Sequence, residues 1–248
     1  GTDLVPLAAA TAKGVPVANL PGANAQSVAE YCVMAMLMLA RNIRAITEAM
    51  RARPWDEARE LAASARELAG LTVGIVGVGE IGARVARICR NGFGMRVLGN
   101  QRRMDRLPPE AEGAELDALV AQSDFVVLAC PLTPETRHLF NAARLAAMKP
   151  GAWLVNVGRG PVVDESALVE ALFEKRLAGA MLDVYEHYRI QAGHPLFALE
   201  NVILTPHLAG STRESRARAA VRAADELLRM LAGERPANLV NPEAWHGR

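Results

Sequence analysis

The chain has 248 residues, 51% of them hydrophobic, so it can bury a sizeable core in one large or two modest domains. Its formal net charge of +1 argues against a nucleic-acid surface or an acidic partner. The longest apolar run, from Cys32 to Ala40, is too short to span a bilayer and lies inside an amphipathic helical pattern.

Residues 15–20 fit a short strand that ends at Pro21, and a long helix is predicted from about Ala25 to Met50. Residues 51–69 are charged and less regular, and we expect them on the surface or at an oligomer contact. From Leu71 onwards strand and helix patterns alternate, which predicts a parallel sheet covered by helices on both faces. The expected strands lie near residues 72–76, 95–99, 124–129, 152–157, 178–182 and 201–204.

The last helix is predicted to begin at a capping box formed by Ser211 and Glu214. Gly233 and Pro236 are expected to end it.

The three cysteines, at positions 32, 89 and 130, lie in apolar contexts and form no CxxC pair. Such thiols are typical of reduced core residues, because disulfides persist in oxidising compartments. No signal peptide is visible, and we expect a cytoplasmic protein without a membrane segment. Because the chain opens on Gly1 rather than on methionine, it could be a fragment of something longer.

Three spaced glycines follow the strand at 72–76, in the run Gly77-Val-Gly79-Glu80-Ile81-Gly82. The first allows a tight turn, the second lets the backbone approach a pyrophosphate, and the third lets the next helix pack against the strand. The N-terminus of that helix also offers N–H groups to the phosphates. The run therefore predicts a dinucleotide-binding turn.

Such folds usually carry an acidic residue about 20 residues past the glycines, where it binds the ribose hydroxyls of NAD. This chain has the uncharged Gln101 at that distance, followed by Arg102 and Arg103. Without a carboxylate a 2′-phosphate is not repelled, and either arginine could bind it with two hydrogen bonds. We expect NADP to be preferred over NAD; the alternative is that both arginines are ordinary surface charges.

Three residues with reactive side chains follow later strands. Arg159 lies between two glycines after the strand at 152–157, where open α/β sheets bind ligands. A guanidinium there can bind a substrate carboxylate and polarise the adjacent carbonyl. Asp183 ends the next strand, and His207 follows the last one. Because imidazole exchanges protons near neutral pH, His207 is the candidate acid–base group.

These motifs resemble those of the D-isomer-specific 2-hydroxyacid dehydrogenases. The similarity covers nearly the whole chain in the right order, through Gly1-Thr-Asp, Pro21-Gly22-Ala-Asn24, Ser27-Val-Ala-Glu30, GVGEIG, Pro131-Leu-Thr-Pro-Glu-Thr136, NVGRG, Asp183-Val-Tyr-Glu and TPHLAGST. It implies an α/β fold with a Rossmann-type doubly wound parallel sheet and a second, smaller, flavodoxin-like substrate domain that is incomplete here. We expect residues 23–212 to form the NAD(P)-binding domain, and residues 1–22 with 213–248 to be the remnant of the substrate domain.

By this resemblance the protein is an oxidoreductase that reduces a 2-oxo acid to a D-2-hydroxy acid with hydride from NAD(P)H, commonly as a homodimer. Arg159 would be the catalytic arginine that binds the carboxylate, His207 the proton donor, and Asp183 a neighbour of the nicotinamide amide. No metal is expected. The alternatives are a nucleotide-sensing, corepressor-like scaffold and an inactive relative that only binds cofactor. Besides the glycine turn and residues 101–103, the cofactor cleft would be lined by Pro131, Thr133, Thr136, Val157, Gly158, Arg159, Asp183, His207, Ala209 and Gly210.

Two features depart from the family pattern. The family usually pairs the catalytic histidine with a Glu five positions after the equivalent of Asp183, where this chain has Tyr188. A phenol can orient an imidazole but carries no charge that favours imidazolium; formate dehydrogenases use a neutral Gln there. Glu186 could substitute if the register shifts by two residues. Secondly, relatives carry a further segment before the equivalent of Gly1, so either the sequence covers part of the protein or the substrate side of the cleft is truncated.

Overall fold

The computed structural model describes residue 2 and residues 5–246, and the chain divides into two compact units. The larger unit spans Val28–Ala209. The smaller unit combines Gly1–Ser27 with Gly210–Arg248.

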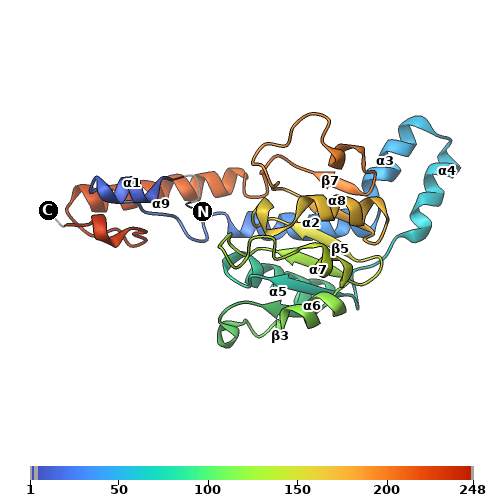
Figure 1. Ribbon diagram of the computed structural model, residues 1–248, viewed down its shortest axis with the longest axis horizontal. Helices are drawn as coiled ribbons and strands as arrows, with labels where there is room; N and C mark the ends of the chain where they lie inside the picture. Colours follow the sequence, from blue (N-terminus) through green and yellow to red (C-terminus); the bar gives the residue numbers. More distant parts are fainter. Residues whose placement is uncertain (1, 3–4, 247–248) are drawn as a thin grey trace. The chain divides into compact units, whose positions relative to one another are not determined.

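The larger unit is built on a sheet of seven strands in the order β3-β2-β1-β4-β5-β6-β7, and every neighbouring pair is parallel (Figure 1). This order reverses direction between β1 and β4, as in dinucleotide-binding folds, so the predicted Rossmann-type sheet is confirmed. The strands are β1 (Thr72–Val76), β2 (Arg96–Asn100), β3 (Glu112–Gly113), β4 (Phe125–Leu128), β5 (Trp153–Asn156), β6 (Gly179–Leu182) and β7 (Val202–Leu204).

Helices flank this sheet on both faces, and its central strands are buried along their whole length. Ile75 and Val76 are neighbours in β1, yet they belong to two different hydrophobic clusters, since successive side chains of a strand point to opposite faces. The first cluster takes side chains from α2 and α5, and the second from α6, α7 and α8. The helices of this unit are α2 (Ala25–Ala40, which begins in the smaller unit), α3 (Ile43–Ala52), α4 (Trp55–Glu60), α5 (Glu80–Phe93), α6 (Leu116–Gln122), α7 (Ala142–Ala146) and α8 (Glu165–Phe173), with short 3₁₀ helices η1 (Leu61–Ser64), η2 (Met104–Arg106), η3 (Gly160–Val162) and η4 (Pro195–Ala198).

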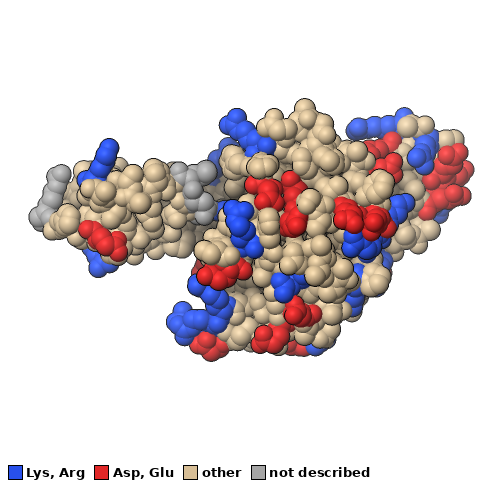
Figure 2. Space-filling view, viewed as in Figure 1, with Lys and Arg blue, Asp and Glu red and all other residues tan. Residues whose placement is uncertain are grey.

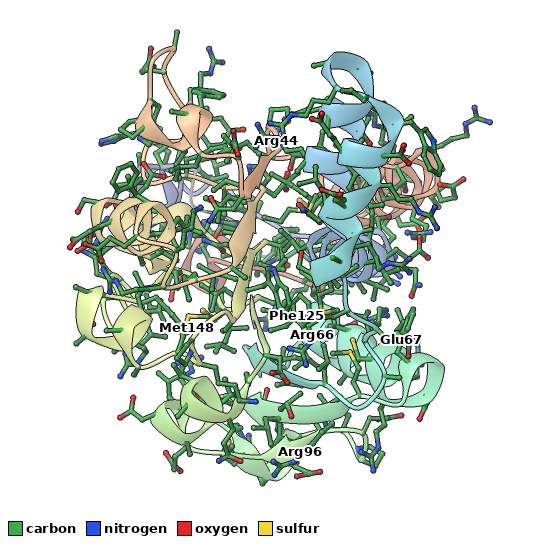
Figure 3. The ribbon with its side chains drawn as sticks, turned by 90° about the vertical axis from the view of Figure 1, so that its right-hand side faces the viewer. Arg44, Arg66, Glu67, Arg96, Phe125 and Met148 are labelled. Carbon is green, nitrogen blue, oxygen red and sulfur yellow. The ribbon has the colours of Figure 1, made fainter. Side chains whose placement is uncertain are left out.

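An arginine lies near each edge of the sheet (Figure 3). Arg44 of α3 donates to the main-chain oxygens of Leu199 and of Val202 in the edge strand β7. At the other edge, Arg96 lies 2.9 Å from a carboxylate oxygen of Glu112 in β3. Edge strands that are capped and charged in this way resist pairing with other chains.

The prediction of one helix from 25 to 50 was wrong. The chain breaks after α2, because Asn42 takes the left-handed conformation with φ of 51° and α3 starts again at Ile43. Asparagine tolerates this conformation better than most residues.

The smaller unit contains α1 (Leu7–Ala12), the long helix α9 (Arg213–Leu231) and η5 (Pro242–Ala244). The prediction of a strand at 15–20 was also wrong. In this segment Ala18 forms an isolated antiparallel bridge with Leu239 and no strand. Helix α9 begins with a capping box one residue later than predicted, because Thr212 and Ser215 exchange the two bonds. Glu214 remains in the first turn, where its charge favours the helix.

The three cysteines are free and buried, as predicted. Among the described residues we find no helix whose length and apolar character would let it cross a membrane. On the surface that Figure 2 displays, basic and acidic side chains are interspersed, in line with the balanced composition.

Candidate active site

Two of the three glycines of the turn, Gly77 and Gly82, are required by close main-chain contacts. Gly77 has φ of 94°, and a Cβ there would lie 2.5 Å from the main-chain nitrogen of Cys130. A Cβ at Gly82 would lie 2.4 Å from the Gly77 oxygen, so the third glycine allows α5 to pack against the turn. By contrast, nothing lies within 4 Å of a Cβ placed at Gly79, the N-cap of α5. The open space at this helix N-terminus fits a diphosphate.

The loop after β4 lies against this turn through the contact between Gly77 and Cys130. Thr136 closes the loop, because its hydroxyl accepts from the Thr133 N–H at 2.7 Å and donates to the Pro131 oxygen at 2.7 Å. The β4 loop therefore begins beside the glycine turn, at the sheet's switch point.

The residues after β2 show how the two arginines differ. The Gln101 side chain donates to the Arg103 main-chain oxygen at 2.8 Å, and the Arg103 guanidinium pairs with Asp105 at 3.0 Å. Arg102 is exposed, and its charge acts weakly on Glu135 of the β4 loop. There the pKa of Glu135 is lowered, mainly by hydrogen bonds from Thr133 and the main chain and more weakly by the charge of Arg102.

The turn that carries Arg159 is fixed by the buried side chain of Asn156. The Asn156 amide accepts from the Gly158 N–H at 3.1 Å and donates to the Arg159 oxygen at 3.2 Å. A Cβ at Gly160 would lie 1.7 Å from the Tyr185 main-chain oxygen, so this turn packs directly against the segment that follows β6. Sequence reasoning missed Asn156; the available signal was an amide ending an otherwise apolar strand.

Asp183 organises the turn that carries His207. Its side chain is 1% exposed, and its carboxylate accepts from the Thr205 hydroxyl at 2.6 Å, the Leu208 N–H at 2.8 Å and the Ala209 N–H at 2.9 Å. The His207 N–H donates to the Asp183 main-chain oxygen at 2.9 Å. These bonds hold His207 in the left-handed conformation, with φ of 53°.

Phenols lie close to the same turn. The Tyr185 hydroxyl donates to the Thr205 oxygen at 2.8 Å, and burial together with the charge of Asp183 raises the pKa of Tyr185 to about 12. The ring of Tyr188 meets the ring of His207 edge-on, with centroids 5.8 Å apart and planes at 69°. A cavity of about 490 Å³ opens beside His207, with Tyr188, Arg189 and Phe197 in its wall.

Glu186 is placed elsewhere. Its carboxylate lies 2.8 Å from Nε2 of His138 and 3.8 Å from the Arg137 guanidinium. Of the two residues that the sequence suggested for orienting His207, the structure brings Tyr188 to the imidazole and directs Glu186 to His138. The pairing with His138 carries no sequence signal, because the two residues are 48 positions apart.

Residues 33–209 match the family model of the "D-isomer specific 2-hydroxyacid dehydrogenase, NAD binding domain". The chain belongs to the D-isomer-specific 2-hydroxyacid dehydrogenase family. This match confirms the resemblance read from the motifs.

Several members of this dehydrogenase family are similar along almost the whole chain. A glyoxylate reductase of Thermofilum pendens is 41% identical over 98% of this chain and 73% of its own length. The apo D-mandelate dehydrogenase of Rhodotorula graminis superposes with a TM-score of 0.87 at 30% identity, over 97% of this chain and 72% of that one. The NAD-dependent formate dehydrogenase of Staphylococcus aureus, solved in complex with NAD, gives a TM-score of 0.85 at 34% identity, over 93% and 69%.

Val157 and Gly210 were also predicted to line the cofactor cleft of this dehydrogenase. Val157 is buried directly after β5. Gly210 belongs to the smaller unit, where a Cβ would lie 2.5 Å from the Asn24 amide nitrogen. Within the part of the chain that the structure describes, we find no cluster of His, Cys, Asp and Glu suited to a metal ion.

Proposed function

We propose that the chain reduces a 2-oxo acid to the D-2-hydroxy acid, using hydride from a bound nicotinamide cofactor. The observation that carries this proposal is that the Arg159 turn and the His207 turn pack on one segment. Gly160 contacts the Tyr185 main chain, and the His207 N–H binds the Asp183 oxygen. These contacts support the proposal that Arg159, as the carboxylate-binding cation, and His207, as the proton donor, act in one site.

In this proposal the guanidinium of Arg159 binds the substrate carboxylate with two hydrogen bonds and draws electron density from the adjacent carbonyl. The imidazole of His207 donates a proton from a ring nitrogen to the carbonyl oxygen as negative charge develops there. In this proposal the ring of Tyr188, which meets the imidazole edge-on, helps to orient it. The nicotinamide, when bound, supplies the hydride, and the glycine turn with the N-terminus of α5 would hold its diphosphate.

The test follows the absorbance of NADPH and NADH in the presence of the full-length protein and glyoxylate, hydroxypyruvate, pyruvate or phenylpyruvate. We expect oxidation of the reduced cofactor with at least one acid, and a product of D configuration. Tight cofactor binding without turnover of any of the four acids would contradict the proposal and favour a nucleotide-binding scaffold.

We also propose that residues 23–212 form the cofactor domain and that residues 1–22 with 213–248 belong to a smaller substrate domain. The division of contacts into Val28–Ala209 and the two terminal segments supports this assignment. The chain covers 73% of the length of its glyoxylate reductase relative.

We propose NADP as the preferred cofactor. Gln101 carries no charge to repel a 2′-phosphate, and Arg102 is exposed after β2, whereas Arg103 is already paired with Asp105. Arg102→Ala is expected to lower kcat/KM for NADPH about tenfold, the size of one lost charge-assisted hydrogen bond. Its kcat/KM for NADH should stay unchanged.

The control for this prediction is Arg106→Ala, which removes an exposed arginine of the nearby helix η2. Arg106→Ala should change kcat/KM neither for NADPH nor for NADH. A wild-type kcat/KM that is higher for NADH than for NADPH would contradict the NADP preference.

We propose a homodimer that uses α3 and α4, which project from the sheet (Figure 1). Large apolar side chains are exposed on these helices: Ile43, Met50 and Trp55. Sedimentation velocity should give twice the mass of the chain, and Trp55→Glu should shift the equilibrium towards monomer. We further propose a cytoplasmic location, which the three free, buried thiols support.

A further inference from the structure

The carboxylate of Asp183 binds groups on both sides of His207 along the chain. One oxygen accepts from the Thr205 hydroxyl and the Leu208 N–H, and the other accepts from the Ala209 N–H. With the bond from the His207 N–H to the Asp183 main chain, four of the five residues from 205 to 209 donate to this one aspartate. The conformation of His207 therefore depends on the position of the Asp183 carboxylate.

Thr205 carries one hydroxyl proton, and an ionised carboxylate can only accept. The 2.6 Å bond to Asp183 therefore uses the proton of Thr205. The same Thr205 oxygen forms a short contact with the hydroxyl of Tyr31, from helix α2, and it must accept there. The order of donation is then fixed: Tyr31 donates to Thr205, and Thr205 donates to Asp183.

Tyr31 is suited to this role because it is buried. Burial raises the pKa of its phenol far above the ordinary value, and the charge of Asp183 raises it further. The hydroxyl therefore keeps its proton near neutral pH and remains a donor. This chain of hydrogen bonds joins helix α2 to the turn that presents His207.

We propose that Tyr31 and Thr205 are positioning residues, which act through Asp183 to hold the His207 imidazole in the orientation that protonates the substrate. The inference rests on the proposed reduction of 2-oxo acids. It adds two residues, each in an apolar segment, that contact neither substrate nor cofactor in the proposed mechanism.

Thr205→Val tests the proposal, because valine keeps the shape of threonine but cannot donate to Asp183. We expect kcat to fall roughly tenfold or more, since small displacements of a catalytic group have large effects on rate. The KM for the 2-oxo acid should change much less, because Arg159 still binds the carboxylate. Thr205→Ser, the matched control, restores the donor and should restore kcat. Tyr31→Phe, which removes only the outer donor, should give a smaller loss.

A second measurement does not depend on turnover. The ring Cε1–H signal of His207 in NMR spectra, assigned by its loss in His207→Asn, should shift in Thr205→Val and return in Thr205→Ser. Wild-type kcat together with an unchanged His207 signal in Thr205→Val would overturn the proposal. If the wild-type protein reduces no 2-oxo acid, the proposed function fails, while the NMR comparison still decides whether Thr205 positions His207. If Thr205→Val does not fold, kcat and the His207 NMR signal are measured in Tyr31→Phe instead, and no change in either would overturn the proposal.

Discussion

Replacing His207 by asparagine is expected to lower kcat for 2-oxo acid reduction by about 10²–10⁴-fold, the usual contribution of a positioned general acid. Asparagine is the appropriate substitution because His207 has φ of 53°, and asparagine adopts left-handed conformations more readily than most residues. The turn and its bonds to Asp183 should therefore survive. Stopped-flow or steady-state measurement of NADPH oxidation gives kcat, and fluorescence titration should show nearly unchanged cofactor binding.

The control for this variant is His187→Asn, which changes an exposed histidine in the segment after β6. It should leave kcat unchanged, so that a general effect of losing an imidazole is excluded. A loss in His207→Asn of less than about threefold, against the 10²-fold minimum for a general acid, would show that another group protonates the substrate.

The dinucleotide turn was predictable because its determinants are local. A buried β-branched strand, three glycines and an amphipathic helix follow one another within about twenty residues, and close main-chain contacts require the first and third glycines. The positions of Arg159, Asp183 and His207 could also be predicted from the sequence. Residues that follow the carboxyl ends of parallel strands lie at one edge of the sheet.

The errors in the fold occurred where the apolar pattern carries no information. The helical periodicity runs on across Asn42, and only its left-handed backbone separates α2 from α3. Strand β3 consists of Glu112 and Gly113, both exposed, and is a strand only because it pairs with β2. Two overlapping capping boxes fit the start of α9, and the added bond from Ser215 to the Gly210 oxygen favours the later one.

The parts of the site that sequence reasoning missed are polar residues inside apolar segments. Asn156, Thr205 and Tyr31 each lie in a run that indicates core, and nothing in the sequence relates Tyr31 to a residue 174 positions away. Their roles depend on hydrogen bonds between distant elements. Such bonds depend on the tertiary packing, which the sequence pattern does not show. The reactive side chains could be predicted because they come directly after strands.

Gly160→Ala is expected to have the largest effect on stability of any single methyl group added near the site. The new Cβ would lie 1.7 Å from the Tyr185 oxygen and 1.8 Å from its carbonyl carbon, and both are main-chain atoms that cannot rotate away. Either the Gly158–Gly160 turn or the segment after β6 must move. We expect a loss of about 3 kcal/mol or more in the free energy of unfolding, at the upper end for overpacking. Urea unfolding followed by circular dichroism measures it.

Gly92→Ala is the matched control, because Gly92 lies in helix α5 and nothing stands within 4 Å of its added Cβ. Alanine there should stabilise the helix by roughly 0.5–1 kcal/mol. If Gly160→Ala unfolds at the wild-type urea concentration, the Arg159 turn does not pack against Tyr185, and the observation that carries the proposed function is lost. If it is folded but destabilised, its kcat/KM should fall as well, because the same movement displaces Arg159 from the substrate carboxylate.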